Sequence, residues 1–327
     1  MSAEKLKLDE VCYKGSSTLM QKSLPIGSGE YPVYGASGLI GEVDFYMQEN
    51  AYIGIVKDGA GVGRAMLLPA KSSCLGTIQY ILPKETIDIR YLFYAIENMR
   101  LSKYSTGATI PHIYFKDYKN ELIPNISLDE QQAVASKLDS IQRSIKRRQA
   151  QLALFDDLVK SQFIEMFGDP IRNTQKRVTT EFINVVKMQR GFDLPVQERV
   201  QSGNVLVFGS NGALDRHNVA KVLGGGVITG RSGTIGKVFY TEEDYWPLNT
   251  SLFSVDTHGN NIIFLAYLLQ LYDLTRFTEG TGVPTLNRNK FHNQQIIDVP
   301  LDEQNAFARF VKQTDKSKNV YVLEVAA

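Results

Sequence analysis

The chain has 327 residues, enough for two domains of ordinary size, and its formal net charge is +1. This near balance excludes a uniformly basic surface, so any contact with nucleic acid must be local. No apolar run is long enough to cross a membrane, the N-terminus lacks the apolar core of a signal peptide, and Cys12 and Cys74 show no metal or redox spacing. These features favour a soluble, cytoplasmic protein.

The first part of the chain, residues 1–126, predicts a domain of strands followed by a helix. Three short apolar runs, broken by Gly, Pro and Ser, are typical of strands joined by tight turns: 31–46, 51–69 and 76–83. The run 89–101 has the apolar spacing of a helix, and the polar loop 105–113 follows it.

A long helix is predicted over 127–170. Ser127 and Glu130 form an S-x-x-E capping box at its start, while Gly168 and Pro170 end it. Roughly 38 helical residues at about 1.5 Å each give a rod of about 57 Å. Apolar residues recur at alternating spacings of three and four, which is typical of a coiled-coil seam. The predicted seam and partner-binding positions are Leu138, Ile141, Ile145, Arg148, Leu152, Phe155, Val159 and Met166. An ordinary core helix of one domain is the alternative; the length and the mid-chain position argue against it.

The order of the first part returns after the long helix. Equivalent residues stand 173 positions apart, as in the pairs Gly63 and Gly236, Pro111 and Pro284, and Gln131 and Gln304. A constant offset over so much of the chain indicates an internal duplication. It predicts a second domain at 171–300 and, at 301–327, a second helix that ends at about Lys318 before a tail. The expected fold is α/β: two similar α+β mixed-sheet domains related by a pseudo-twofold axis and joined by long coiled-coil helices.

The glycine-rich turns carry cations. The segment 230–238 resembles a phosphate loop, but Arg231 stands where G-x-x-x-x-G-K-[ST] requires Gly, and Val238 replaces Ser or Thr. Hairpin turns that need positive φ account for these glycines. The cations Lys57 and Arg64 in one copy, and Arg231 and Lys237 in the other, are interpreted either as phosphate or base contacts or as solvated turn residues.

The sequence shows no catalytic or metal-binding pattern. No two of the four histidines, His112, His217, His258 and His292, stand at metal-ligand spacing, and no Ser or Cys lies in a nucleophile-elbow context. N-P-P-Y and D-P-P-Y are absent, so the chain lacks the usual mark of an amino-methyltransferase. We therefore expect neither a metal nor catalytic residues.

Two sets of residues carry a family resemblance. L-D-E-Q opens both long helices, at 128–131 and 301–304, and DLVKSQFIEMFGDP at 157–170 ends the first helix. With a domain before each helix, the chain resembles the specificity (S) subunit of Type I restriction–modification systems over nearly its whole length. The short second helix departs from that pattern and puts full partner docking in doubt.

The resemblance implies a non-catalytic subunit in which each domain, a target-recognition domain, reads half of a bipartite site in double-stranded DNA. The helices would space the domains and dock methyltransferase (modification) subunits. These subunits would carry S-adenosylmethionine for DNA methylation of adenine, so the chain itself would need no cofactor, and a separate motor–nuclease (restriction) subunit would cleave.

On this interpretation, the DNA contacts fall in turns that repeat in backbone pattern but not in polar identity. Arg and Asn have the donor geometry for guanine and adenine edges. The predicted contacts are Lys57, Arg64, Thr109, His112, Asn211, Arg231, Lys237, Thr285, Asn287 and Arg288. The main alternative is a duplicated protein- or glycan-binding scaffold that oligomerises through its coiled coil. A nucleotide-using enzyme is a third, disfavoured by the failed motifs.

Overall fold

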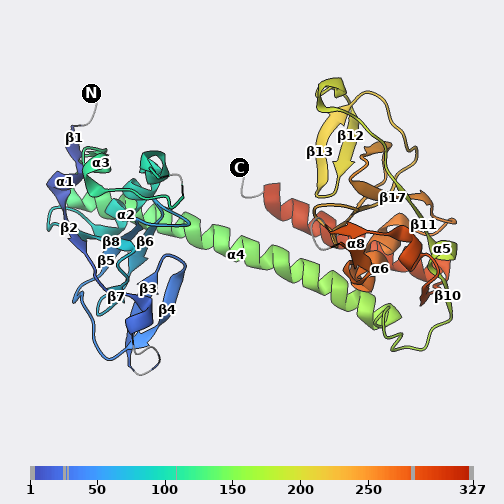
Figure 1. The fold of residues 1–327 in the computed structure, drawn as a ribbon, viewed down its shortest axis with the longest axis horizontal. Helices are drawn as coiled ribbons and strands as arrows, with labels where there is room; N and C mark the ends of the chain where they lie inside the picture. Colours follow the sequence, from blue (N-terminus) through green and yellow to red (C-terminus); the bar gives the residue numbers. More distant parts are fainter. Residues whose placement is uncertain (1–3, 25–26, 28, 108, 281–283, 324–327) are drawn as a thin grey trace. The chain divides into compact units, whose positions relative to one another are not determined.

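The computed structural model describes residues 4–24, 27, 29–107, 109–280 and 284–323, so residues 324–327 of the predicted tail lie outside it. Figure 1 traces the elements along the chain. The chain divides into two compact units, unit 1 (Met1–Arg147) and unit 2 (Arg148–Ala327), and helix α4 (Leu128–Phe167) contributes to both. Among the helices in the described ranges, none combines the length and apolar character that crossing a bilayer requires.

Unit 1 is built on a four-stranded and a three-stranded sheet. The larger has the order β2-β8-β5-β6 and is antiparallel throughout: β2 (Cys12–Ser16), β8 (Ile78–Pro83), β5 (Tyr52–Val56) and β6 (Ala65–Leu68). The smaller has the order β4-β3-β7 and ends in a parallel pair: β4 (Gly38–Val43), β3 (Tyr31–Gly35) and β7 (Ser73–Cys74). A strand pair and short helices complete the unit: β1 (Lys5–Lys7), β9 (Leu122–Pro124), α1 (Leu8–Val11), α2 (Ile89–Met99) and α3 (Phe115–Tyr118).

Unit 2 repeats these sheets. The larger has the order β11-β17-β14-β15: β11 (Lys187–Arg190), β17 (Ser251–Asp256), β14 (Gly226–Gly230) and β15 (Val238–Thr241). The smaller has the order β13-β12-β16, again with a parallel pair: β13 (Gly212–His217), β12 (Val205–Gly209) and β16 (Tyr245–Pro247). The remaining elements are β10 (Thr179–Glu181), β20 (Gln295–Ile297), β18 (Thr278–Glu279), β19 (Thr285–Leu286), α5 (Phe182–Val185), α6 (Ile262–Tyr272), α7 (Arg288–Phe291) and α8 (Leu301–Leu323).

The strand order of the two units is therefore the same. Even the register shift recurs, between Val33 and Tyr34 in β3 and between Val207 and Phe208 in β12. Helices α2 and α6 begin 173 residues apart, as do α4 and α8. The predicted duplication of a mixed-sheet α/β domain with a long helix is confirmed.

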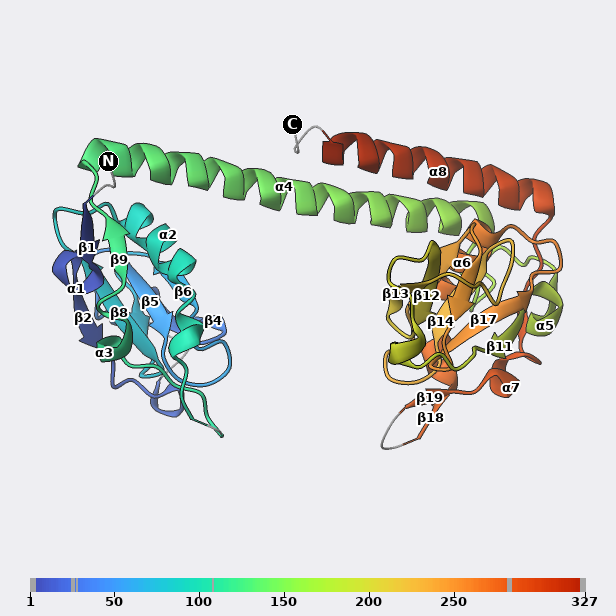
Figure 2. The ribbon, with the colours of Figure 1, turned by 90° about the horizontal axis from the view of Figure 1, so that it is seen from above.

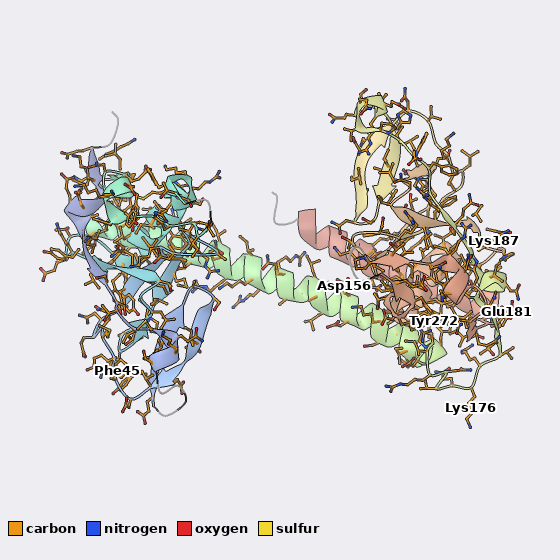
Figure 3. All side chains as sticks on the ribbon, in the orientation of Figure 1. Phe45, Asp156, Lys176, Glu181, Lys187 and Tyr272 are labelled. Atoms are coloured by element: carbon orange, nitrogen blue, oxygen red, sulfur yellow. The ribbon has the colours of Figure 1, made fainter. Side chains whose placement is uncertain are left out.

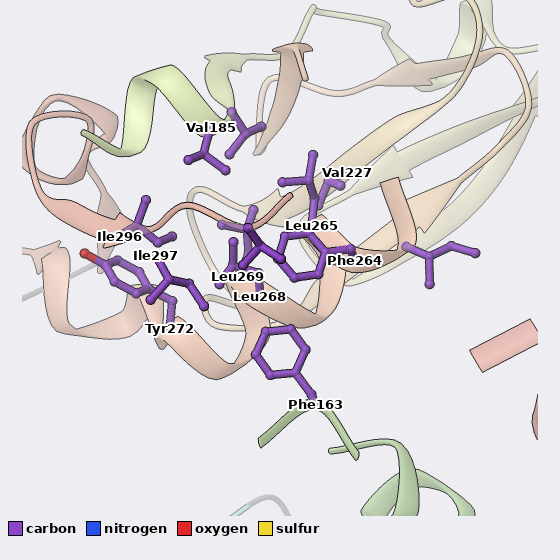
Figure 4. Packing of buried hydrophobic residues seen from close by; sticks show 14 of the residues in the cluster. Phe163, Val185, Val227, Phe264, Leu265, Leu268, Leu269, Tyr272, Ile296 and Ile297 are labelled. Carbon is purple, nitrogen blue, oxygen red and sulfur yellow. The ribbon is translucent and has the colours of Figure 1, made fainter. Parts of the chain in front are cut away.

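Each unit buries one helix against its larger sheet. In unit 1, Leu92 and Ile96 of α2 are buried and cluster with Ile53 of β5. In unit 2, the apolar side chains of α6 pack against Val227 of β14, as Figure 4 shows. Each fully buried aliphatic side chain contributes about 1.5–3 kcal/mol, so these helices anchor their units.

The ends of α4 follow the sequence signals. The Ser127 backbone amide donates to Glu130 Oε2 at 2.9 Å, and the Glu130 amide donates to Ser127 Oγ at 3.4 Å, which is the predicted capping box. The Glu130 carboxylate also accepts from Ser127 Oγ at 2.7 Å, and this bond, with the one from the Ser127 amide, lowers its pKa. Gly168 has φ +77°, the left-handed conformation that ends a helix.

Helix α8 corrects one expectation. Its end was predicted at about Lys318, because the β-branched residues that follow suit a helix poorly, yet α8 continues to Leu323. β-branched residues cost only a few tenths of a kcal/mol each in a helix, and no Gly or Pro stands in this stretch to stop it. With 23 residues against 40, α8 is still much shorter than α4.

Candidate nucleic-acid interface

In unit 1, the turn after β5 meets the polar loop that follows α2. The Lys57 carbonyl accepts from the Ile113 amide at 2.9 Å, and the Gly59 amide donates to Pro111 O at 2.9 Å. Arg64, at the other end of the turn, donates through Nη2 to the Ala36 carbonyl in the β3–β4 hairpin. Three segments that are distant in sequence are thus joined at one end of the larger sheet.

The loop itself is closed by His112. His112 and Thr106 exchange backbone hydrogen bonds at 2.8 and 2.9 Å, so Thr109 lies near the tip, exposed. Gly107 has φ +95°, and a Cβ there would lie 2.5 Å from Ile110 O, so this position requires glycine. The loop therefore holds a defined shape that presents Thr109 outward, while the His112 ring contacts Tyr114 edge to face at 5.0 Å.

Unit 2 builds the same junction from different side chains. The Arg231 carbonyl accepts from the Leu286 amide at 2.7 Å, which ties the turn after β14 to the second polar loop, and Ser232 pairs with Thr285. Lys237 Nζ donates to Asn211 Oδ1 at 2.7 Å, which ties the turn to the β12–β13 hairpin. Lys237 is the repeat counterpart of Arg64, so a cation joins turn to hairpin in both units.

Arg231 is held in place and partly covered. Its Nε donates to the Asn249 carbonyl at 3.0 Å. Burial lowers its pKa, and the nearby charge of Arg190 adds to the effect. Arg190 ends β11, and the sheet order brings this strand end next to Gly230, since Arg190 pairs with Leu252 while Ser251 pairs with Gly230. Two guanidinium groups at one sheet end attract an anion.

Sequence reasoning missed Arg190. Its structural counterpart is Ser16, because Arg190 pairs with Leu252 and Ser16 pairs with Gln79, which stands 173 residues before Leu252. The position therefore carries a charge in one copy only, and the strand that ends there was not recognised. The signal available was the cation immediately before Gly191, at the end of a short strand.

Asn287 and Arg288 belong to a different charge group. Asn287 caps α7, accepting from the Asn289 amide at 3.1 Å, and donates to Glu279 Oε2 at 3.2 Å. Burial lowers the pKa of His292, and the charges of Arg288 and Lys187 lower it further. The Met188 amide of β11 donates to His292 Nε2 at 3.2 Å, so His292 lies beside the start of that strand, where Lys187 stands.

The predicted seam residues on α4 differ in their exposure to solvent. Ile141 and Ile145 are exposed, Leu138, Arg148, Leu152, Phe155 and Met166 are half-buried, and Val159 is buried. The side chains that enter the core of unit 2 are Val159, Phe163 and Phe167, spaced by four, and two of these lie off the predicted seam. Figure 3 marks Asp156 on the stretch of α4 before them.

Metal-ligating and thiol side chains are distributed as follows in the described residues. His, Cys, Asp and Glu side chains in these ranges form no group of three or more that could hold a metal ion. Cys12 and Cys74 are buried free thiols, and burial raises the pKa of each to about 12, which leaves them protonated and unreactive.

Comparisons with known proteins agree with this organisation. A family model described as the Type I restriction modification DNA specificity domain matches twice, at residues 2–154 and 172–320. The crystal structure of the S subunit of a Type I restriction–modification system from M. genitalium is similar, with a TM-score of 0.67 and 16% identity, covering 99% of this chain and 92% of that one. A chain from a structural study of complex assembly and conformational transition in the type I R-M system has a TM-score of 0.52 and 16% identity, covering 98% and 92%. No curated protein gives a significant match.

Proposed function

The chain belongs to the Type I restriction-modification DNA specificity family, and from this premise we propose that each unit reads one half of a bipartite DNA site. The observation that carries the proposal is the repeated junction of turn, hairpin and polar loop. Its backbone is the same in both units, while Lys57, Arg64 and His112 in one are replaced by other polar groups in the other. Two copies of one scaffold with different donors read two different sequences.

The division of labour between phosphate and base contact follows from how each cation is held. Lys237 and Arg64 are engaged with the hairpins, so they shape the surface and add positive charge for phosphate. Arg231 and Arg190 stand at neighbouring strand ends of the larger sheet, where either guanidinium can donate to both O6 and N7 of one guanine or the two can contact adjacent phosphates.

We also propose that the long helices dock methyltransferase subunits, which supply S-adenosylmethionine and all catalysis; a motor–nuclease subunit joins through that complex. Support comes from the exposed apolar side chains along α4: Ile141, Ile145, Leu154 and Leu158. Within each pair the two residues stand four apart and so share a face of the helix, and exposed apolar groups of this kind are typical of a partner interface.

The test uses the chain in complex with its co-expressed methyltransferase. Arg231→Ala costs about 1–3 kcal/mol in binding to the methylated sequence if the guanidinium contacts a base. Lys176→Ala, an exposed cation on the connection after α4, is the matched control and leaves affinity unchanged. Because phosphate contacts release counterions, the log of affinity falls linearly with the log of salt concentration. An affinity that is flat with salt contradicts the proposal and favours a protein- or glycan-binding scaffold.

A further inference from the structure

One glutamine is buried at the same place in each long helix. Gln131 of α4 is 5% exposed and Gln304 of α8 is 1% exposed, although both stand in the first turn or so of helices whose neighbouring residues face solvent. A buried amide is costly unless its donors and its acceptor are all paired. The hydrogen-bond partners of these two side chains therefore show why a glutamine stands at this position.

Gln131 joins three segments of unit 1. Its Oε1 accepts from the Asp88 amide at 2.8 Å, and its Nε2 donates to Ile126 O at 3.0 Å and Thr86 O at 3.3 Å. Asp88 is the N-cap of α2 and accepts from the Arg90 amide at 2.9 Å. The amide thus connects the chain entering α4, the chain entering α2 and the first turn of α2.

Gln304 repeats this arrangement in unit 2. Its Oε1 accepts from the Asn261 amide at 2.8 Å, and its Nε2 donates to Val299 O at 2.7 Å and Asn260 Oδ1 at 2.6 Å. Asn261 is the N-cap of α6, as Asp88 is of α2. The glutamine is the same in both copies while the cap residue changes from Asp to Asn. The glutamine amide is therefore the shared group that holds the long helix against the start of the shorter one.

The start of α4 depends on such directional contacts. Around Gln131, the helix is held by buried Ala135 and by Asp139, which accepts from Arg90 Nη1 at 2.9 Å and from Tyr94 OH at 2.7 Å. Its far end packs into the apolar core of unit 2, and there Gln175 and Arg177 donate to backbone carbonyls of the last turn. Apolar contacts are non-directional, whereas hydrogen bonds weaken steeply when bent, so the polar contacts fix the angle of the helix on unit 1.

We infer that Gln131 and Gln304 are positioning residues that fix the angle between each unit and its long helix, and that Gln131 thereby sets the unread spacing of the DNA site. The inference rests on the proposed function. A helix of 40 residues is about 60 Å long. A tilt of about 10° at its start moves the far end by about 10 Å perpendicular to the helix axis, and the part of this movement that lies along the DNA changes the spacer by one base pair for each ~3.4 Å. A small angular freedom therefore changes the spacer that the complex accepts.

The test compares Gln131→Met, which keeps side-chain length and removes all three hydrogen bonds, with Gln132→Met at the exposed neighbouring position. Methylome sequencing of cells that carry the complex measures methylation at sites with the native spacer and at sites one base pair longer or shorter. We expect Gln131→Met to raise the ratio of off-spacer to native-spacer methylation at least about tenfold, because the loss of even one of the three buried hydrogen bonds is worth about that factor, with both half-sites unchanged. A merely structural role lowers methylation at every site and leaves this ratio alone.

A second measurement does not depend on DNA. Spin labels at Lys14 and Ser144, both exposed and both in unit 1, report the distance between the sheet and α4 by double electron–electron resonance; the native cysteines are buried. The distance distribution broadens in Gln131→Met and stays narrow in Gln132→Met. If Gln131→Met does not fold, Gln131→Glu, which keeps the acceptor toward Asp88, is measured in the same two ways. An unchanged distribution together with an unchanged spacer overturns the inference. Absence of bipartite methylation by the wild-type complex overturns the proposed function instead. The distance measurement then still tests whether Gln131 fixes the angle of α4 on unit 1.

Discussion

Replacing Phe163 with Ala should destabilise unit 2 although Phe163 lies on α4. The ring is fully buried, and its centroid lies 4.9 Å from that of Phe167, 5.7 Å from Phe264 of α6 and 5.3 Å from Phe307 of α8. Figure 2 shows α8 running alongside the last part of α4. Truncation removes one ring from a four-ring cluster and leaves a cavity that packed neighbours fill only in part.

The magnitude follows from that cavity. Phe→Ala in a core costs about 3–5 kcal/mol, a large share of the roughly 5–15 kcal/mol that stabilises a domain. For a unit of this size, about 1 kcal/mol shifts Tm by roughly 2–4 °C. The expected decrease in Tm is therefore roughly 6–20 °C.

The chain provides its own reporter of unit 2. Trp246 is the single tryptophan and is 7% exposed in β16. Its fluorescence follows unfolding of unit 2 with no added probe. Leu154→Ala is the matched control, because Leu154 lies on the same helix and is 66% exposed; its effect stays within about 0.5 kcal/mol. If Phe163→Ala and Leu154→Ala melted alike, the end of α4 would not belong to the core of unit 2, and the packing argument would be wrong.

Three further outcomes are expected. Inserting seven residues after Ala150 keeps the heptad phase and lengthens α4 by about 10 Å, so methylome sequencing should show an unread spacer about three base pairs longer with both half-sites intact. An active complex that kept the original spacer would show that the length of α4 does not set the spacer. Exchanging residues 1–126 for those of a relative should change one half-site only, and a change in both would contradict independent reading. Because burial lowers the pKa of His292, the unfolded state binds a proton at His292 more readily than the folded state. The contribution of His292 to the stability of unit 2 is therefore complete above about pH 6.5 and is lost as pH falls further. Melting curves followed by Trp246 fluorescence measure this loss, and His292→Gln should make the stability less dependent on pH in this range.

The duplication and the ends of α4 could be predicted because their signals are local. Glycine at Gly63 and Gly236, at φ +87° and +91°, marks the turns in both copies, and the capping box marks the helix start. A local signal of this kind needs no knowledge of what packs against it.

The side chains that fill the core and those of the candidate nucleic-acid interface could not be predicted in the same way. Phe163 and Phe167 follow Val159 at spacings of four, along the 3.6-residue period that packs onto a globular core, whereas a 3.5-residue seam favours Met166. The choice between the two periods is made by α6 and α8, which are distant in sequence. Arg190 comes near Arg231 only through the sheet order, and the charge of Arg288 acts on His292 only because α7 places the two residues four positions apart beside β11.

Helix α4 separates two properties that are usually coupled in one element. Its end contributes aromatic surface to the core of unit 2, so its loss is measured as free energy of unfolding. Its start makes directional hydrogen bonds to unit 1, so the loss of these bonds is measured as a change in the angle between α4 and unit 1. Gln131 and Phe163 stand about 48 Å apart along the helix and share no hydrogen-bond or ring contact among the described residues, and distant sites with separate partners act additively. The double variant Gln131→Met/Phe163→Ala should therefore combine the spacer ratio of the first with the melting temperature of the second. A double variant whose spacer ratio exceeded that of Gln131→Met alone would mean that the aromatic end also constrains the angle, and the separation of roles along α4 would have to be abandoned.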